Sequence, residues 1–523
     1  MTNKKFLAGL VLLVCLVSID CLAQEETYRY ADATQLWRLT DNAAGLALDS
    51  SANRGVSFFD LQHNESDYHR IQEGTQRNQL QFYTERYQQI SALLVGYGSF
   101  RFDMDHTKGR AWCDVMRPYN SNPFFSGSSV SGKYDTQQFD LTAALGTRQL
   151  WGFTGGLRLD YSVGDLSRLR DPRSRSELLD YKLAPSLTYS TGSHTVGIAG
   201  HYNRRKEKIP SMTTVQQDPD LKYYLMTGME QATGTTGGYS GYNREWVDHR
   251  FGAELTYGYN NGNVKSLSSV TIERGSEDVL GTYKYEPGHY TSYRYGLASH
   301  NRISSDRMLH QIDLTAGYEQ AYADEYRQQL VQERDAEKGY TSYHYETLIT
   351  FKKRYQVKQL NADLHYRLSA VDGSTSTTVP EGSPAGITSY IGAKATLHQA
   401  ENKHLLPASS LEYTHLDFAL EGGTSLLKNR QLWLDAEAGY HLSTKADLQL
   451  TDATTDYAAG VLLPDMQYYD ANYWRGHLAL TYQFPLSLKG KRTTAFVSAY
   501  GDYLSADHGL NGSTVGLSFG LFN

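Results

Sequence analysis

Three residue types that together can form a hydrolytic site occur within one short segment. The segment "SHNRISSD" (299–306) places His300, Asn301 and Ser304 close together in the sequence. In such a site the histidine takes the proton of the serine hydroxyl, and a third polar side chain orients the histidine. The segment resembles a turn or strand end, and no surrounding pattern supports this chemistry. A hydrolase is therefore an alternative that we do not favour.

A dense cluster of charge could bind an anion. The segment "DLSRLRDPRSRSELLD" (165–180) contains four guanidinium groups within eight residues. Guanidinium groups form paired hydrogen bonds with phosphate or carboxylate oxygens. The same segment also holds carboxylates that could neutralise them, and we favour this self-neutralised interpretation. The candidate anion-contacting residues are Arg168, Arg170, Arg173 and Arg175.

Other motifs of catalysis or cofactor binding are absent from the sequence. The chain has no Gly-x-Ser-x-Gly and no His-Glu-x-x-His motif. The glycine-rich segment "GTTGGYSG" (234–241) is not followed by the Lys-Ser/Thr pair of a phosphate-binding loop. Of the three cysteines, only Cys113 lies beyond the N-terminal apolar segment, so no disulfide framework is expected. We predict that the protein is not an enzyme and has no cofactor or metal.

The end of the sequence has a strictly alternating pattern. In "STVGLSFGLFN" (513–523), Val515, Leu517 and Phe519 alternate with small or polar residues. A period of two is typical of a strand with one apolar and one polar side. In a closed barrel the last strand pairs with the first, which would give this strand a partner.

The same alternation recurs upstream, and it places charges on the polar side of the strands. It is found around 153–161, 251–259, 360–368 and 416–421. A charge at the centre of a strand costs little if it faces a wide, water-filled lumen, where it would influence which solutes pass. The predicted lumen-lining residues are Arg158, Asp160, Glu254, Asp363, Arg367, Asp417 and Glu421.

Strand length and composition favour a membrane barrel over a soluble sandwich. Segments such as 149–163 and 247–261 exceed the usual strand of about 5–6 residues, whereas a tilted membrane strand needs about 9–11. The 41 tyrosines suit the aromatic girdles of such a barrel. We predict an all-β fold, a transmembrane antiparallel up-and-down β-barrel of about 16 strands, within a range of about 14 to 18.

The N-terminus has the layout of a secretory signal peptide. Lys4 and Lys5 precede an apolar run, and the small Ala23 precedes polar residues. We predict a signal peptide over 1–24; a lipoprotein signal at Cys15 or Cys21 is a less favoured alternative. The remaining predicted parts are an N-terminal segment over 25–53, periplasmic or tucked into the lumen, and the outer-membrane barrel over 54–523.

Short turns alternate with long loops along the predicted strands. Asymmetry of this kind is typical of outer-membrane barrels, with short turns on one side and long loops on the other. The segment 320–339 has helix-like charge spacing, with strand tips joined by a solvated loop as the alternative. The predicted short turns include 190–194, 260–263, 427–430 and 488–492, and the predicted long stretches are 107–133, 206–246, 372–385 and 445–470.

Two segments carry a resemblance to known proteins. "TDNAAGLAL" (40–48) resembles the start of several Bacteroidota outer-membrane barrels, with Ala43 in place of the usual proline. "RDPRSRSELLDYKLAPSLTY" (170–189) is similar to an uncharacterised Bacteroidota outer-membrane β-barrel family built around an Asp-Pro-Arg segment. The resemblance implies an association with TonB-dependent receptors, and so a nutrient- or iron-uptake setting, but no activity or ligand.

These observations define a predicted function and its alternatives. We predict a passive channel or accessory barrel for solute uptake in the outer membrane. The alternatives are a plugged structural or assembly partner of another outer-membrane complex and, less favoured, an outer-membrane hydrolase. The expected partners are outer-membrane lipid and, through the resemblance, a TonB-dependent receptor or lipoprotein. The formal net charge of −7 argues against nucleic-acid binding.

Overall fold

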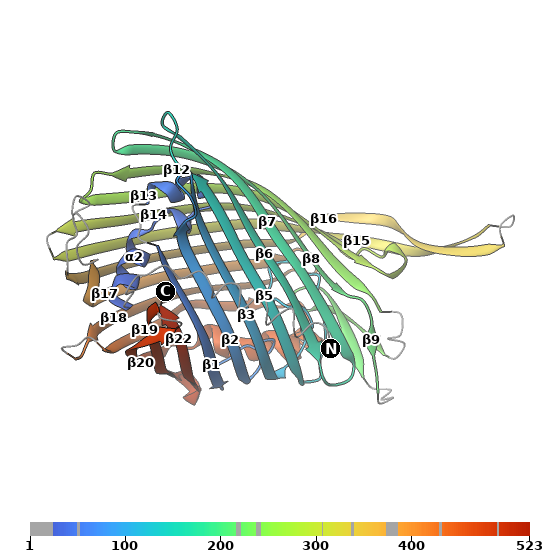
Figure 1. Cartoon of the computed structure of the whole chain (residues 1–523). Helices are drawn as coiled ribbons and strands as arrows, with labels where there is room; N and C mark the ends of the chain where they lie inside the picture. The colour runs from blue at the N-terminus through green and yellow to red at the C-terminus, as the bar shows by residue number, and fades with distance from the viewer. Residues whose placement is uncertain are drawn as a thin grey trace.

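The chain forms a closed antiparallel β-barrel (Figure 1). The computed structural model describes residues 25–49, 53–215, 221–236, 242–305, 307–335, 339–372, 385–427, 431–488 and 491–522. Eighteen strands form the barrel wall, and one short strand pairs outside it. The predicted fold class is thereby confirmed; the number of strands is at the top of the predicted range and two above the preferred value of 16.

The wall strands are long and follow one another around the barrel in chain order. The first nine are β1 (Arg54–Ser66), β2 (Gln76–Gln89), β3 (Leu94–Arg110), β5 (Gly132–Thr147), β6 (Phe153–Arg168), β7 (Arg173–Thr191), β8 (His194–Ile209), β12 (Arg244–Asn260) and β13 (Val264–Gly281). The other nine are β14 (Gly288–Ser305), β15 (Met308–Asp335), β16 (Tyr340–Asp372), β17 (Gly386–His404), β18 (Ser409–Ser425), β19 (Leu432–Gln449), β20 (Tyr473–Leu488), β21 (Lys491–Ala506) and β22 (Asn511–Phe522).

The last strand closes the barrel by pairing with the first. β22 runs antiparallel to β1 in a register from Val56 opposite Phe522 to Ser66 opposite Gly512. Each wall strand therefore has two hydrogen-bonded neighbours, and the wall has no open edge. This pairing confirms the role predicted for the alternating C-terminal segment.

The two sides of the strands differ as their alternation predicts. On β22 the outward Val515, Leu517 and Phe519 are 59%, 45% and 46% exposed, because no protein covers them. These side chains belong to an apolar belt around the outside of the barrel. On neighbouring strands the belt continues through residues that lie opposite one another, for example from Phe519 to Phe59 and on to Phe82. The inward positions carry the polar and charged side chains. Such a belt is the lipid-facing surface of a membrane barrel.

The two ends of the barrel differ in the length of their connections. At the end where β1 begins and β22 ends, most connections are short, such as 192–193 and 261–263; we call this the short-turn end. The opposite loop end carries the long connections 111–131, 210–243 and 450–472. The predicted long stretch 372–385 connects β16 to β17 at the short-turn end instead, and most of it lies outside the described residues.

Residues 25–49 lie inside the barrel at the short-turn end; we call them the lumenal segment. The segment contains α2 (Glu25–Thr34) and the 3-10 turns η1 (Trp37–Leu39) and η2 (Ala43–Leu48). α2 contacts β1 and β17, while η2 contacts β3, β5, β6 and β7. Gly156 of β6 allows η2 to lie close to the wall, since a Cβ at this position would lie 2.1 Å from the Ala44 nitrogen.

Described parts of the long connections fold inward at the loop end. They contain the strands β4 (Ser126–Ser128), β10 (Lys222–Gly228) and β11 (Gln231–Thr236), which form a small sheet, and the helices η4 (Ala458–Leu462) and α3 (Leu463–Asp470). The short β9 (Met212–Thr213) pairs with the start of β7. Nowhere in the described ranges is a helix both long and apolar enough to cross a bilayer.

β15 and β16 continue beyond the barrel as a two-stranded arm at the loop end (Figure 1). The helix-like interpretation of 320–339 is wrong, because β15 is extended as far as Asp335. Its charges have the spacing of a helix, but pairing with β16 satisfies the backbone of the segment as a strand.

Candidate functional site: the barrel lumen

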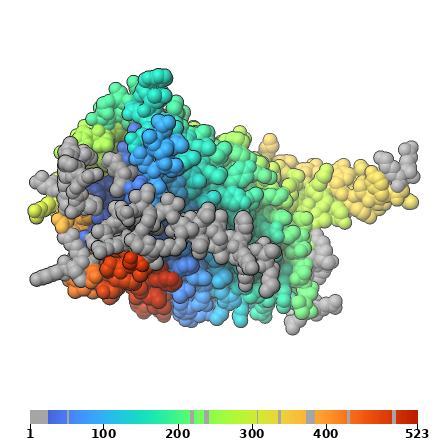
Figure 2. Space-filling view, in the orientation of Figure 1, coloured from blue at the N-terminus to red at the C-terminus, as the bar shows by residue number. Residues whose placement is uncertain are grey.

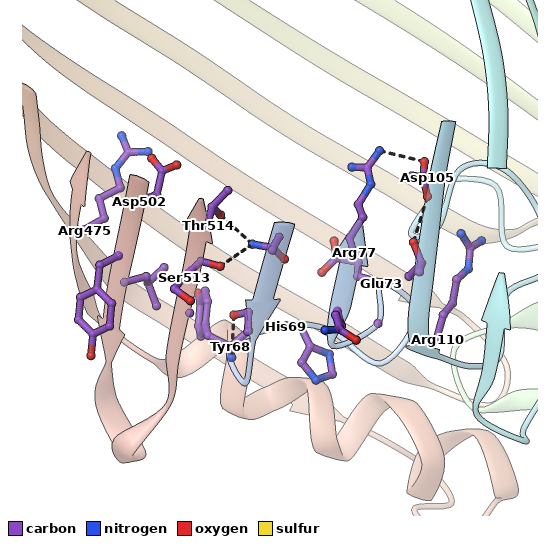
Figure 3. A pocket seen from close by; sticks show the side chains of 18 of the residues that line it. Tyr68, His69, Glu73, Arg77, Asp105, Arg110, Arg475, Asp502, Ser513 and Thr514 are labelled. Atoms are coloured by element: carbon purple, nitrogen blue, oxygen red, sulfur yellow. Dashed lines mark hydrogen bonds and ion pairs between the residues drawn. The ribbon is translucent and has the colours of Figure 1, made fainter. Parts of the chain in front are cut away.

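A polar cavity lies inside the barrel near the loop end (Figure 3). Its volume is about 640 Å³, and its walls come from β1, β2, β3, β5 and β19–β22. The Arg77 guanidinium pairs with Asp105 at 3.1 Å, and the Arg475 guanidinium pairs with Glu437 at 3.1 Å. Asp105 is buried, but the two arginines and Glu437 are only partly buried, so the cavity presents charges of both signs to a solute.

A second cavity, of about 620 Å³, lies between the lumenal segment and the wall. Tyr28 and Arg38 line it from the segment, and Phe58, Ser498 and Ser518 line it from the wall. It combines aromatic rings on one side with ion pairs such as that of Arg302 and Asp313 on the other. The cavity thus offers both an apolar and a charged surface to a solute, beside the lumenal segment at the short-turn end.

A short stretch of wall separates the two cavities. On β22, Thr514 lines the first cavity and Ser518 the second, so only Gly516 faces inward between them. The Tyr500 ring lies against Gly516, where a Cβ would be 2.1 Å from the ring, and its hydroxyl donates to Asp60 at 2.9 Å. Glycine lets the ring lie against the wall at this position.

One side of α2 is fixed by a buried carboxylate of the wall. The Glu85 oxygens accept hydrogen bonds from the hydroxyls of Tyr28 (2.6 Å), Tyr83 (2.9 Å) and Tyr97 (2.9 Å). Glu85 also pairs with the Arg54 guanidinium, and the two residues are 5% and 3% exposed. We call these five residues the Glu85 cluster. Its charges are neutralised inside the protein, as buried ions require.

The other side of α2 is fixed to a second part of the wall, on β19. The Arg29 guanidinium pairs with Glu25 at 2.6 Å and with Asp435 of β19 at 2.8 Å. It also lies 4.5 Å from the centre of the Trp433 ring. The helix is thus held between wall strands that are far apart in the sequence.

The turns of the lumenal segment are anchored on β7, β8 and β12. The Asp41 carboxylate pairs with the Lys182 ammonium at 2.6 Å and lies 3.2 Å from the His201 ring. The Asn42 amide donates to the Thr256 hydroxyl at 3.0 Å. With the α2 contacts, these bonds tie the segment to strands on several sides of the barrel, and the segment narrows the short-turn end.

The seven predicted lumen-lining residues occupy inward positions but do not surround one opening. Arg158 donates to the carbonyl oxygens of Arg38 and Thr40, both at 3.1 Å, so it holds the lumenal segment. Glu254 accepts a hydrogen bond from the backbone of the same segment. The other contacts are Asp160 with Arg158, Asp363 with Thr315 and Thr396, Asp417 with His441, and Glu421 with Arg367, His365 and Lys394.

The four arginines of the predicted anion-contacting cluster have separate partners. Arg168 is buried and donates to the Tyr134 hydroxyl and the Val130 carbonyl. The others bind near neighbours: Arg170 the Ser131 carbonyl, Arg173 the carboxylate of Asp171, and Arg175 that of Asp165. Arg173 and Arg175 thus pair with carboxylates of their own segment, as the self-neutralised interpretation expects, whereas Arg168 and Arg170 bind neutral oxygens outside it.

The three residues of the predicted hydrolase alternative do not form a catalytic arrangement. Alternation along β14 puts His300 on the inward side and Asn301 on the outward side. The His300 ring bonds to Asp313 at 2.7 Å, and Asn301 bonds to Ser266. Ser304 is four residues from His300 along an extended strand, about 13 Å away.

Asp465, in the connection 450–472, joins two other connections of the loop end, 67–75 and 111–131, and no sequence motif singled it out. Its carboxylate accepts a hydrogen bond from the Ile71 amide at 2.8 Å and another from the Tyr119 hydroxyl. Although both bonds favour the ionised form, burial outweighs them and raises the pKa of the Asp465 carboxyl to about 6.

The stability of these connections is expected to depend on Asp465 and on pH. Folding raises the pKa of this carboxyl, so the folded form binds its proton more tightly than the unfolded chain does. The resulting stabilisation is fully present at pH values below the pKa of the unfolded chain and is lost as the pH rises through about 6. We expect slower proteolysis of the 67–75 and 111–131 connections at pH 5 than at pH 8 in detergent micelles. Asp465→Asn should flatten this difference; an unchanged difference would contradict this role of Asp465.

The fold and the lumen together define the class of protein. A closed barrel of long strands with an apolar belt outside and polar side chains inside is an outer-membrane β-barrel. The chain belongs to DUF6850, a family of unknown function, whose sequence profile matches residues 43–523. In such barrels short turns face the periplasm, which puts the lumenal segment at the periplasmic end.

The comparison with curated proteins returned no match. Solved structures with a similar fold include the outer membrane transporter YddB from Escherichia coli (9% identity, 89% of this chain and 81% of that chain covered, TM-score 0.39). Others are the siderophore receptor PiuA from Acinetobacter baumannii (8%, 89% and 81%, 0.35) and OccAB4 from the same organism (10%, 90% and 98%, 0.33).

Proposed function

We propose that the protein is a passage for small polar solutes across the outer membrane. The observation that carries the proposal is the position of the two cavities. Both use inner faces of β1, β2, β20, β21 and β22, and one inward residue of β22 lies between them. Solutes would pass along this side of the barrel, which we call the passage wall.

The opposite side of the lumen near the loop end is occupied by protein. Phe124 packs there with Trp246 and Tyr290 in one buried apolar cluster. The indole nitrogen of Trp246 donates to the Phe124 carbonyl at 2.6 Å. The Asn122 amide donates to the wall carboxylate Glu277 at 2.8 Å. Since this packing excludes solutes, it supports a passage confined to the other side.

The proposal is tested by blocking the passage wall chemically. Ser498 lines the second cavity, and its neighbour Ala499 faces outward on the same strand. We expect Ser498→Cys barrels in planar bilayers to lose at least about half of their conductance when a charged thiol reagent attaches there. The native Cys113 is fully buried, so it contributes little background. Ala499→Cys is the matched control and should show no such loss.

A plugged assembly partner is the second candidate, and the lumenal segment favours it. The segment binds several wall strands and narrows the periplasmic end, as a plug would. Correctly folded wild-type barrels that never open in a bilayer would support this candidate and contradict the passage.

A more specific proposal, about the partners of the barrel, rests on sequence resemblance. The resemblance of 170–189 to a Bacteroidota barrel family supports a place beside a TonB-dependent receptor or a lipoprotein in nutrient uptake. Copurification from native membranes after mild crosslinking tests it, and recovery of the barrel without either kind of partner would count against it.

A further inference from the structure

The arm of β15 and β16 projects from the loop end of the barrel (Figure 2), and the connection from β13 to β14 packs against it. β14 pairs with β15 only as far as Glu325, and β17 pairs with β16 only from Tyr355. Beyond these points the two strands pair only with each other in the described part of the chain. An isolated two-stranded ribbon gains little stability in water, and the solute passage does not require it.

One face of the arm collects tyrosines. Tyr343 pairs across the arm with Gln332, and Tyr345 pairs with Leu330, so all four side chains share one face. The turn η3 (Thr282–Lys284) and the residue after it add Tyr283 and Tyr285 to this face. The ring centres of Tyr283 and Tyr343 are 5.5 Å apart, and those of Tyr285 and Tyr345 are 5.1 Å apart. We call these four rings the tyrosine face.

Two of the four rings of the tyrosine face are presented to solvent, and the other two, those of Tyr285 and Tyr345, are half-buried. Tyr283 is 52% exposed and Tyr343 is 41% exposed. Tyr283 and Lys284 both have a left-handed backbone, with φ of 57° and 61°. Residues other than glycine seldom adopt this conformation. The turn therefore adopts an unfavourable backbone conformation at Tyr283, and this conformation places the exposed Tyr283 ring beside the ring of Tyr343.

The chemistry of this face matches a carbohydrate. Tyrosine rings stack on the C–H faces of sugar rings, and the phenol hydroxyl offers a hydrogen bond. Gln332 and Thr347 add an amide and a hydroxyl at the same face, the latter bonded to Gln328 at 3.0 Å. By alternation, the carboxylates Glu333 and Glu346 lie on the opposite face, whereas Arg334, near the tip of the arm, shares the tyrosine face.

We propose that the tyrosine face binds an extended neutral polysaccharide at the cell surface. An added strand from a protein partner fits less well. At the base of the arm the pairing is irregular between Ala323 and Glu325 and again between Arg327 and Gln328. Bulges of this kind twist a strand and disrupt the edge that an incoming strand would need. The rings, in contrast, are presented on the flat face of the ribbon.

The experiment uses the whole protein in detergent micelles and gel electrophoresis through dextran, mixed-linkage β-glucan or mannan. We expect at least one of these polysaccharides to retard the wild-type barrel. Tyr283→Ala and Tyr343→Ala should each weaken the apparent affinity about tenfold, the effect of losing one aromatic stacking contact. Tyr343→Phe keeps the ring and should retain most of the binding.

Tyr340→Ala is the matched control, because Tyr340 is 53% exposed but lies on the opposite face of the arm. It should leave the retardation unchanged. The proposal is overturned if none of the three polysaccharides retards the wild type, or if Tyr340→Ala loses as much affinity as Tyr343→Ala. It is also overturned if the arm instead captures an extended peptide. Heat-modified migration in detergent gels verifies that each variant has a folded barrel.

Discussion

Deleting residues 25–49 is expected to raise the single-channel conductance of the barrel at least about twofold, since barrels of 16–18 strands leave an aqueous channel unless something fills it. The deletion removes α2, η1 and η2 from the periplasmic end, where they form one wall of the second cavity. The segment and the loop end narrow the passage in series, so removing one of them lowers the total resistance. Larger sugars should also enter liposomes that contain the variant.

The measurement is conductance in planar bilayers, with swelling of liposomes in sugars of increasing size as a second readout. Deleting 327–349 is the matched control, because it removes a similar length of chain from the arm, outside the lumen. That control should conduct like the wild type. A folded barrel without 25–49 that conducts no better than the wild type would show that the segment does not limit passage.

Glu85→Ala is expected to destabilise the protein by about 3 kcal/mol, because it removes one of the two carboxylate partners of a buried guanidinium and leaves buried hydroxyls without an acceptor. The substitution leaves the buried Arg54 guanidinium with Asp32, at 3.1 Å, as its remaining carboxylate partner, and it removes the acceptor for three tyrosine hydroxyls. Because Tyr28 belongs to α2, the lumenal segment should detach more readily and its proteolysis should accelerate. The variant should therefore also conduct better than the wild type.

Urea unfolding in micelles measures the change in stability, and proteolysis of the segment gives the local effect. Glu65→Ala is the control: its side chain is 70% exposed, so its loss should cost less than about 0.5 kcal/mol. Glu85→Gln keeps an acceptor but not the charge and should fall between the two. Equal stability of Glu85→Ala and Glu65→Ala would contradict the role of the Glu85 cluster.

Local sequence determined the strands and their two sides. The alternation of Val515, Leu517 and Phe519 was sufficient to predict a strand and its apolar face, because successive side chains of a strand point to opposite sides. It also predicted that the charges of Arg158 and Glu254 face inward. Where charge spacing replaced apolar alternation, as in 320–339, the pattern was ambiguous, and pairing with β16 decided for a strand.

The tertiary structure alone decided what those inward charges do. Arg158 and Glu254 hold the lumenal segment, and Glu85 and Asp465 carried no sequence motif at all. Arg29 meets Asp435 across 406 residues of sequence. Such a contact depends on the number of strands, their register and the inward folding of the connections. Alternation along one strand reports only which side a residue faces; closure of the whole barrel determines which residues meet inside it.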